Sequence, residues 1–117
     1  NLDAARRRLM DILCNYAGYR KCVPILVFDA YRVKGAGREQ ETWHNLHVIY
    51  TREAETADMF IERATHELAK NHRVRVVSSD GAEQIIILGN GALRVSARAF
   101  EREVRAVEAE IREFLDQ

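Results

Sequence analysis

Three aspartates stand where apolar runs of the chain end or where a helix is predicted to begin. Asp29 follows the apolar run 25–28, Asp80 follows the run 74–77 and two serines, and Asp58 lies at a predicted helix start. Glu55 lies three residues before Asp58, so on a helix the two carboxylates share a face. In an open α/β sheet, ligands bind beyond the carboxyl ends of the strands. We therefore expect these acids to face one crevice.

Carboxylates that are held close together repel one another unless a cation lies between them. Mg²⁺ and Mn²⁺ prefer oxygen ligands, activate water and stabilise charge on a phosphodiester. We therefore expect Asp29, Asp58 and Asp80 to be metal ligands, directly or through water. Glu55 is expected to position a water or accept a proton, and Ser79 to hydrogen-bond a phosphate or a metal-bound water. The alternative is that each acid only stabilises a helix start or a turn.

Composition excludes several other classes of function. The chain has 117 residues, with 18 Lys and Arg balanced by 18 Asp and Glu, so its net charge does not attract nucleic acid or anionic membrane. No apolar run approaches the ~20 residues of a membrane span. The four histidines and two cysteines show no zinc-ligand spacing. Two cysteines without a leader segment predict reduced thiols and a cytoplasmic location.

Helical periodicity and β-branched runs alternate along the chain. Helices are predicted over 2–18, with Gly18 as the stop, over 56–70, and from the capping residue Ser96 to about 115. Strands are predicted over 22–28, 46–50, 74–77 and 93–95. This order indicates one α/β domain with a largely parallel sheet.

Two segments are harder to assign. Residues 30–44 form a polar loop in which Arg32, Lys34 and Arg38 either steer an RNA backbone towards Asp29 or simply face solvent. Residues 82–88 fit a short helix or an apolar strand, and their position after a strand favours the helix. Glu83 in this segment is a weaker site candidate, since a helix acid facing solvent explains it equally well.

Four spaced motifs, at 27–30, 50–58, 77–84 and 93–97, resemble the YacP-like branch of the NYN domains. This resemblance implies a PIN-like, Rossmann-like three-layer sandwich with a mostly parallel sheet of strand order 3-2-1-4-5. It also implies a metal-dependent endoribonuclease that cleaves single-stranded mRNA in association with the bacterial ribosome, using Mg²⁺ or Mn²⁺. The family's site acids correspond to Asp29, to Asp58 with Glu55 beside it, and to Asp80, which Ser78 and Ser79 precede.

The resemblance has one departure. The family begins with a central strand that ends in an Asp-Gly-Tyr-Asn type motif, and residues 1–117 contain no such segment. We therefore expect an N-terminally incomplete domain in which the strands that end at Asp29 and Asp80 flank the position of the absent strand. An upstream segment or another chain is expected to fill that position.

Two other functions compete with the nuclease. A signalling receiver domain would use Asp29 as phosphoacceptor and would need a lysine after its last strand, which residues 93–97 lack. A non-catalytic RNA- or ribosome-binding module with the same fold stays open, because the first site acid is absent. The sequence carries no signal for an oligomeric state.

Overall fold

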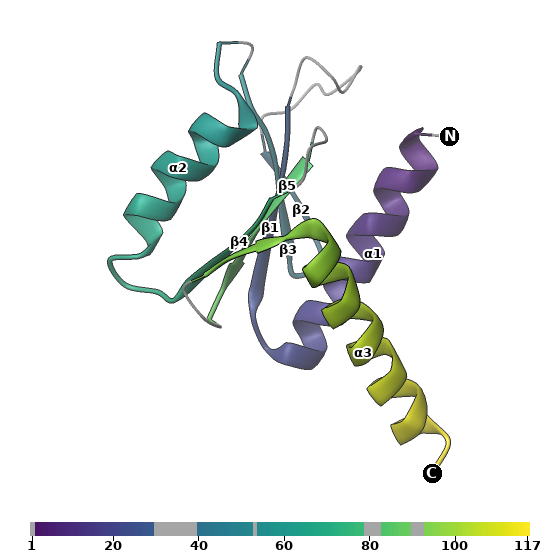
Figure 1. Cartoon of the computed structure of the whole chain (residues 1–117). Coiled ribbons are helices and arrows are strands. Elements are labelled where there is room, and N and C mark those ends of the chain that lie inside the picture. The colour runs from purple at the N-terminus through teal and green to yellow at the C-terminus, as the bar shows by residue number, and fades with distance from the viewer. Residues whose placement is uncertain (1, 30–39, 53, 79–82, 90–92) are drawn as a thin grey trace.

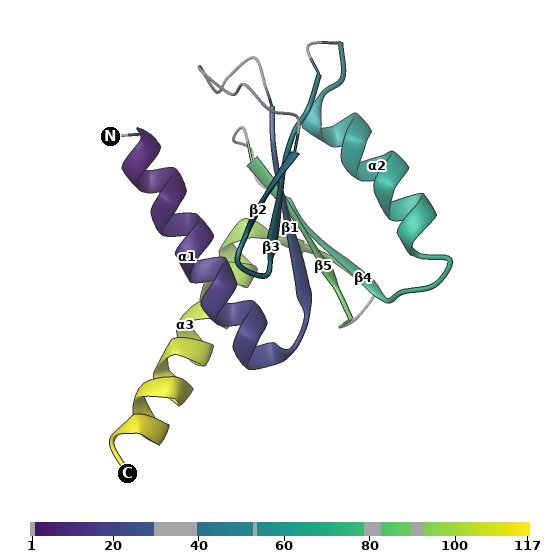
Figure 2. The same ribbon diagram turned by 180° about the vertical axis from the view of Figure 1, so that it is seen from behind.

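The structure, a computed structural model, describes residues 2–29, 40–52, 54–78, 83–89 and 93–117. In these ranges three helices surround one six-stranded sheet (Figure 1). The helices are α1 (Leu2–Arg20), α2 (Ala57–Leu68) and α3 (Ala97–Leu115). The strands are β1 (Val23–Phe28), β2 (Gln40–Trp43), β3 (Leu46–Tyr50), β4 (Val74–Ser78), β5 (Glu83–Leu88) and β6 (Arg94–Ser96). Helix α2 covers one face of the sheet, while α1 and α3 cover the other (Figure 2).

The sheet has the strand order β2-β3-β1-β5-β4-β6 and is mixed. Strand β1 runs parallel to β3, and β4 runs parallel to β6. The other neighbouring pairs of described strands are antiparallel. The α/β class is therefore confirmed, but the prediction of a mostly parallel sheet is wrong.

Strand β5 lies at the centre of the sheet, between β1 and β4. The prediction of a helix over 82–88 is therefore wrong for the described residues 83–88. The reason is burial on both sides of the sheet: Ile85 and Ile87 pack in the core under α1 and α3, and Ile86 packs under α2. A helix would bury one stripe only. As expected, β1 and the strand before Asp80 flank a single central position. The expectation that an upstream segment or another chain fills it is wrong for the described residues, because β5 of this chain pairs with both neighbours.

Two smaller predictions also need correction. Part of the predicted loop 30–44 forms β2, which pairs with β3 through a tight turn at His44, whose φ of 54° is in the left-handed region. Helix α1 does not stop at Gly18 but continues to Arg20, and Lys21 ends it with a left-handed φ of 56°. Neither left-handed residue is glycine, so composition did not reveal these turns.

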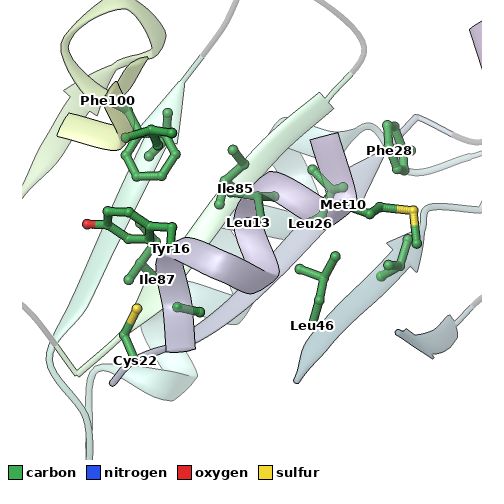
Figure 3. Packing of buried hydrophobic residues seen from close by; sticks show 14 of the residues in the cluster. Met10, Leu13, Tyr16, Cys22, Leu26, Phe28, Leu46, Ile85, Ile87 and Phe100 are labelled. Atoms are coloured by element: carbon green, nitrogen blue, oxygen red, sulfur yellow. The ribbon is translucent and has the colours of Figure 1, made fainter. Parts of the chain in front are cut away.

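The larger core lies between the sheet and helices α1 and α3 (Figure 3). Helix α1 contributes Met10, Leu13 and Tyr16 to it. Helix α3 buries an apolar stripe, Phe100, Val104 and Val107, and the predicted cap Ser96 accepts a hydrogen bond from Ala99 N at 3.1 Å. This stripe packs against the sheet in the same core as α1. No helix in the described ranges has the length and apolar character needed to cross a membrane.

One polar cluster ties α1, β4 and α3 together. Arg75 donates two hydrogen bonds to Glu103, both 2.6 Å long, and one of 2.7 Å to the Tyr16 hydroxyl. The Tyr16 hydroxyl donates to Glu103 at 2.7 Å. Burial and the bond to Glu103 raise the pKa of Tyr16 to about 12, and the bonds from Arg75 lower the pKa of Glu103. These groups are outside the site described below and stabilise the layer that supports it.

Candidate functional site at the start of helix α2

Asp29 directly follows β1 and reaches the first turn of α2. Its Oδ1 accepts a hydrogen bond from the backbone N of Ala57, 2.5 Å away, and the side chain is half-buried. Free backbone N–H groups and the positive end of the helix dipole both favour a carboxylate here. The local fold therefore orients Asp29 before any ligand binds.

Asp58 lies in the first turn of α2 and meets the sheet through Gln84 of β5. The Gln84 Nε2 donates a hydrogen bond to Asp58 Oδ1. Gln84 pairs in register with Val27 on β1 and is only 6% exposed, whereas Asp58 is exposed. Because β5 is antiparallel to β1, its first residues lie at the edge where β1 ends. The ends of three elements therefore bring Asp29, Asp58 and Gln84 to one edge of the sheet.

Two threonines hold the segments that carry these groups. Thr51 is buried after β3, and both its backbone N, at 3.0 Å, and its Oγ1, at 3.3 Å, donate to the carbonyl of Phe28. Thr56 is the N-cap of α2 and accepts a hydrogen bond from Met59 N at 3.1 Å. Thr51 thereby ties the end of β1 to the segment after β3, and Thr56 stabilises the first turn of α2.

Glu55 occupies a different position from the predicted one. It lies in the turn before the cap Thr56, so it does not share the first helical turn with Asp58. Its two carboxylate oxygens pair with Arg63 at 3.0 and 3.2 Å. The Arg63 side chain is 65% exposed and the Glu55 side chain 24%, so solvent screens the ion pair in part and it contributes about 1 kcal/mol.

The other predicted site residues are only partly visible. Asp80, Ser79, Arg32, Lys34 and Arg38 lie outside the described residues. The hydroxyl of Ser78, at the end of β4, accepts a hydrogen bond of 2.8 Å from Arg94. Glu83 begins β5 opposite Phe28 rather than lying on a helix, so its interpretation as a helix acid is wrong.

Comparison with known proteins identifies the family. A family model of the YacP-like NYN domain matches residues 1–117. The protein YacP of Bacillus subtilis (strain 168) is 41% identical over 112 residues, which are 95% of this chain and 65% of that protein. The chain belongs to the YacP-like NYN domain family. It spans about two thirds of the length of this relative, and no solved structure shows significant similarity to it.

The NYN family is associated with nuclease-like, RNA-related functions. The question for this site is therefore whether its residues could hold a divalent cation. Among the described residues of this YacP-like NYN domain, no group of three or more His, Cys, Asp or Glu could hold a metal ion. Asp29 and Asp58 nevertheless lie at the same helix start, and Asp58 is bonded to Gln84, whose buried Oε1 has no hydrogen-bond partner among the described residues. Two carboxylates and an unpaired amide oxygen are the donor types that a hard divalent cation prefers. The residues present therefore fit Mg²⁺ or Mn²⁺.

Gln84 is the residue of this NYN site that was not singled out from the sequence. The available signal was one polar side chain directly before the apolar run 85–88. That signal becomes readable only when the run is known to be a central strand, because a buried strand position normally holds an apolar residue.

Proposed function

We propose that this YacP-like NYN domain belongs to a divalent-metal-dependent endoribonuclease that cleaves single-stranded RNA. The observation that supports this proposal is the placement of Asp29, Asp58 and Gln84, with its unpaired amide oxygen, at one edge of the sheet. Asp80, two residues after the end of β4 in the sequence, is proposed as the third carboxylate. When bound, Mg²⁺ or Mn²⁺ would supply activation of water and stabilisation of charge on the phosphodiester.

The chain's own residues have distinct proposed roles. Asp29 is pre-oriented by Ala57 N, and Asp58 is oriented by the Gln84 amide, so both carboxylates need little rearrangement to hold a cation. Glu55 would accept a proton after it leaves Arg63. Ser79 would contact a phosphate oxygen or a metal-bound water.

The test is cleavage of a labelled single-stranded RNA by the full-length protein in Mg²⁺, in Mn²⁺ and in chelator. Asp58→Asn should reduce cleavage by about 100-fold or more, because a charged ligand is lost. The matched control is Glu67→Gln, an exposed acid of the same helix that pairs with Lys70, and it should cleave as wild type does. RNA binding without cleavage would instead favour the non-catalytic binding module, and cleavage in chelator would refute the metal-dependent mechanism.

We propose further that the ribosome, in the cytoplasm, presents the mRNA. Balanced charges of 18 and 18 provide little attraction for free RNA, so a larger assembly would have to supply affinity. Arg32, Lys34 and Arg38 are the proposed contacts. Changing all three to Ala should weaken cosedimentation with ribosomes, and an unchanged distribution would remove this segment from the proposal.

A further inference from the structure

The two ends of the Gln84 amide have different surroundings. Nε2 donates to Asp58 Oδ1, while the buried Oε1 has no hydrogen-bond partner among the described residues. The orientation of the amide follows from this contact, because only the nitrogen end can face a carboxylate; the oxygen end would be repelled. Oε1 therefore points away from the Asp58 oxygen that the amide holds.

A structural role explains the nitrogen of the Gln84 amide but not its oxygen. Holding Asp58 in place accounts for Nε2. It does not account for Oε1, because a buried carbonyl oxygen without a partner destabilises the folded state. The neighbours on the same face of β5 and β1, Ile86 and Val27, are fully buried and apolar. Among these apolar neighbours, the unpaired Oε1 requires another explanation.

We infer that Gln84 is a further residue of the metal site and acts through both ends of its amide. Nε2 fixes Asp58, and Oε1 is a neutral oxygen ligand for the divalent cation, directly or through one water. A neutral ligand adds an oxygen without adding repulsion to Asp29 and Asp58. This inference rests on the proposed metal-dependent function. It adds a neutral amide oxygen to the carboxylates that were predicted from the sequence.

The experiment measures Mn²⁺ affinity by calorimetry, and thermal unfolding in chelator and in Mn²⁺, on the full-length protein. Gln84→Met keeps the length of the side chain but removes both polar atoms, and it should weaken Mn²⁺ binding about 10- to 100-fold. Gln84→Glu keeps an oxygen at the same place. It should bind Mn²⁺ at least as tightly as wild type, while being less stable in chelator because it repels Asp58.

The matched control is Thr65→Val. The Oγ1 of Thr65 is also a buried atom without a partner among the described residues, but it lies two turns along α2 from Asp58. Its removal should leave Mn²⁺ affinity unchanged. The control separates the effect of removing any unpaired buried polar atom from the effect of removing a ligand.

The outcomes separate this inference from the proposed function. If Gln84→Glu loses Mn²⁺ affinity as Gln84→Met does, Gln84 only positions Asp58 and the ligand role is refuted. If wild type binds Mn²⁺ and both variants bind it equally well, this inference fails while the metal-dependent function stands. If wild type itself shows no Mn²⁺ binding, both fail. Since Gln84→Glu retains a polar side chain, it decides the question even where Gln84→Met does not fold.

Discussion

Asp29 has two tasks that substitutions can separate. Its Oδ1 accepts a hydrogen bond from Ala57 N, which stabilises the start of α2, and its charge is proposed to hold a cation. Asp29→Ala removes both the acceptor and the charge. Asp29→Asn keeps an oxygen in the same place and removes only the charge. The two variants should therefore differ in their stability without metal, and both should lose the stabilisation that metal gives to wild type.

The expected sizes follow from the geometry. In chelator, Asp29→Ala loses a charge-assisted bond at a half-buried helix start, which costs about 1.5 kcal/mol. At roughly 4 °C per kcal/mol for a domain of this size, the midpoint of unfolding falls by about 6 °C. Asp29→Asn keeps the acceptor and loses only about 0.5 kcal/mol of interaction with the helix dipole. It should unfold within about 2 °C of wild type.

Added metal should stabilise wild type much more than either variant. At a Mn²⁺ concentration of about 100 times the dissociation constant, wild type gains about 2.7 kcal/mol, or roughly 10 °C. Both variants should lose most of this gain, because each lacks the anionic ligand. The assay is thermal unfolding followed by circular dichroism in chelator and in Mn²⁺, with Glu67→Gln as the control that keeps the full shift.

Two results would refute this reasoning. A full Mn²⁺ shift in Asp29→Asn would show that the carboxylate is not a metal ligand and that Asp29 serves α2 alone. Wild-type stability of Asp29→Ala in chelator would show that the bond to Ala57 N does not contribute to folding.

Three further predictions concern the layers that support the site. Glu103→Gln should lower the free energy of unfolding in urea at pH 7 by about 2 kcal/mol. This value lies between those of exposed and buried ion pairs, because the Arg75 side chain is 14% exposed and that of Glu103 is 38% exposed. Since the folded-state pKa of Glu103 is lowered below 4.5, this difference should vanish as the pH falls through it; a constant difference would contradict the ion pair. Wild type should lose stability as the pH rises from 10 towards 12, the raised pKa of Tyr16. Tyr16→Phe should show a smaller loss, because burial also raises the pKa of Tyr50 and leaves part of the effect in place. Ile86→Ala should cost about 3 kcal/mol, because Ile86 is 0% exposed in the central strand, and a cost below about 1 kcal/mol would argue against that position.

Local patterns in the sequence were sufficient to locate α1, α2 and α3 and the cap of α3, but they did not give the end of α1. The apolar stripe of α3 and the capping residue Ser96 act over a few residues, so periodicity alone located them. The family motifs are also local, and the match over residues 1–117 confirms the family. The carboxylate side chains themselves pointed to oxygen-ligand chemistry, because the preference of carboxylates for hard cations does not depend on the fold.

The tertiary structure determined the elements and contacts whose partners are distant along the chain. The run 85–88 fits a helix or a strand by itself, and it becomes β5 because β1 and β4 supply hydrogen bonds on both sides. Polar residues 40–43 become β2 because β3 pairs with them. The same cause determines the site: Asp29 meets Ala57 28 residues away, and Asp58 meets Gln84 26 residues away. Contacts over such separations depend on how the whole sheet closes, and no local pattern in the sequence records them.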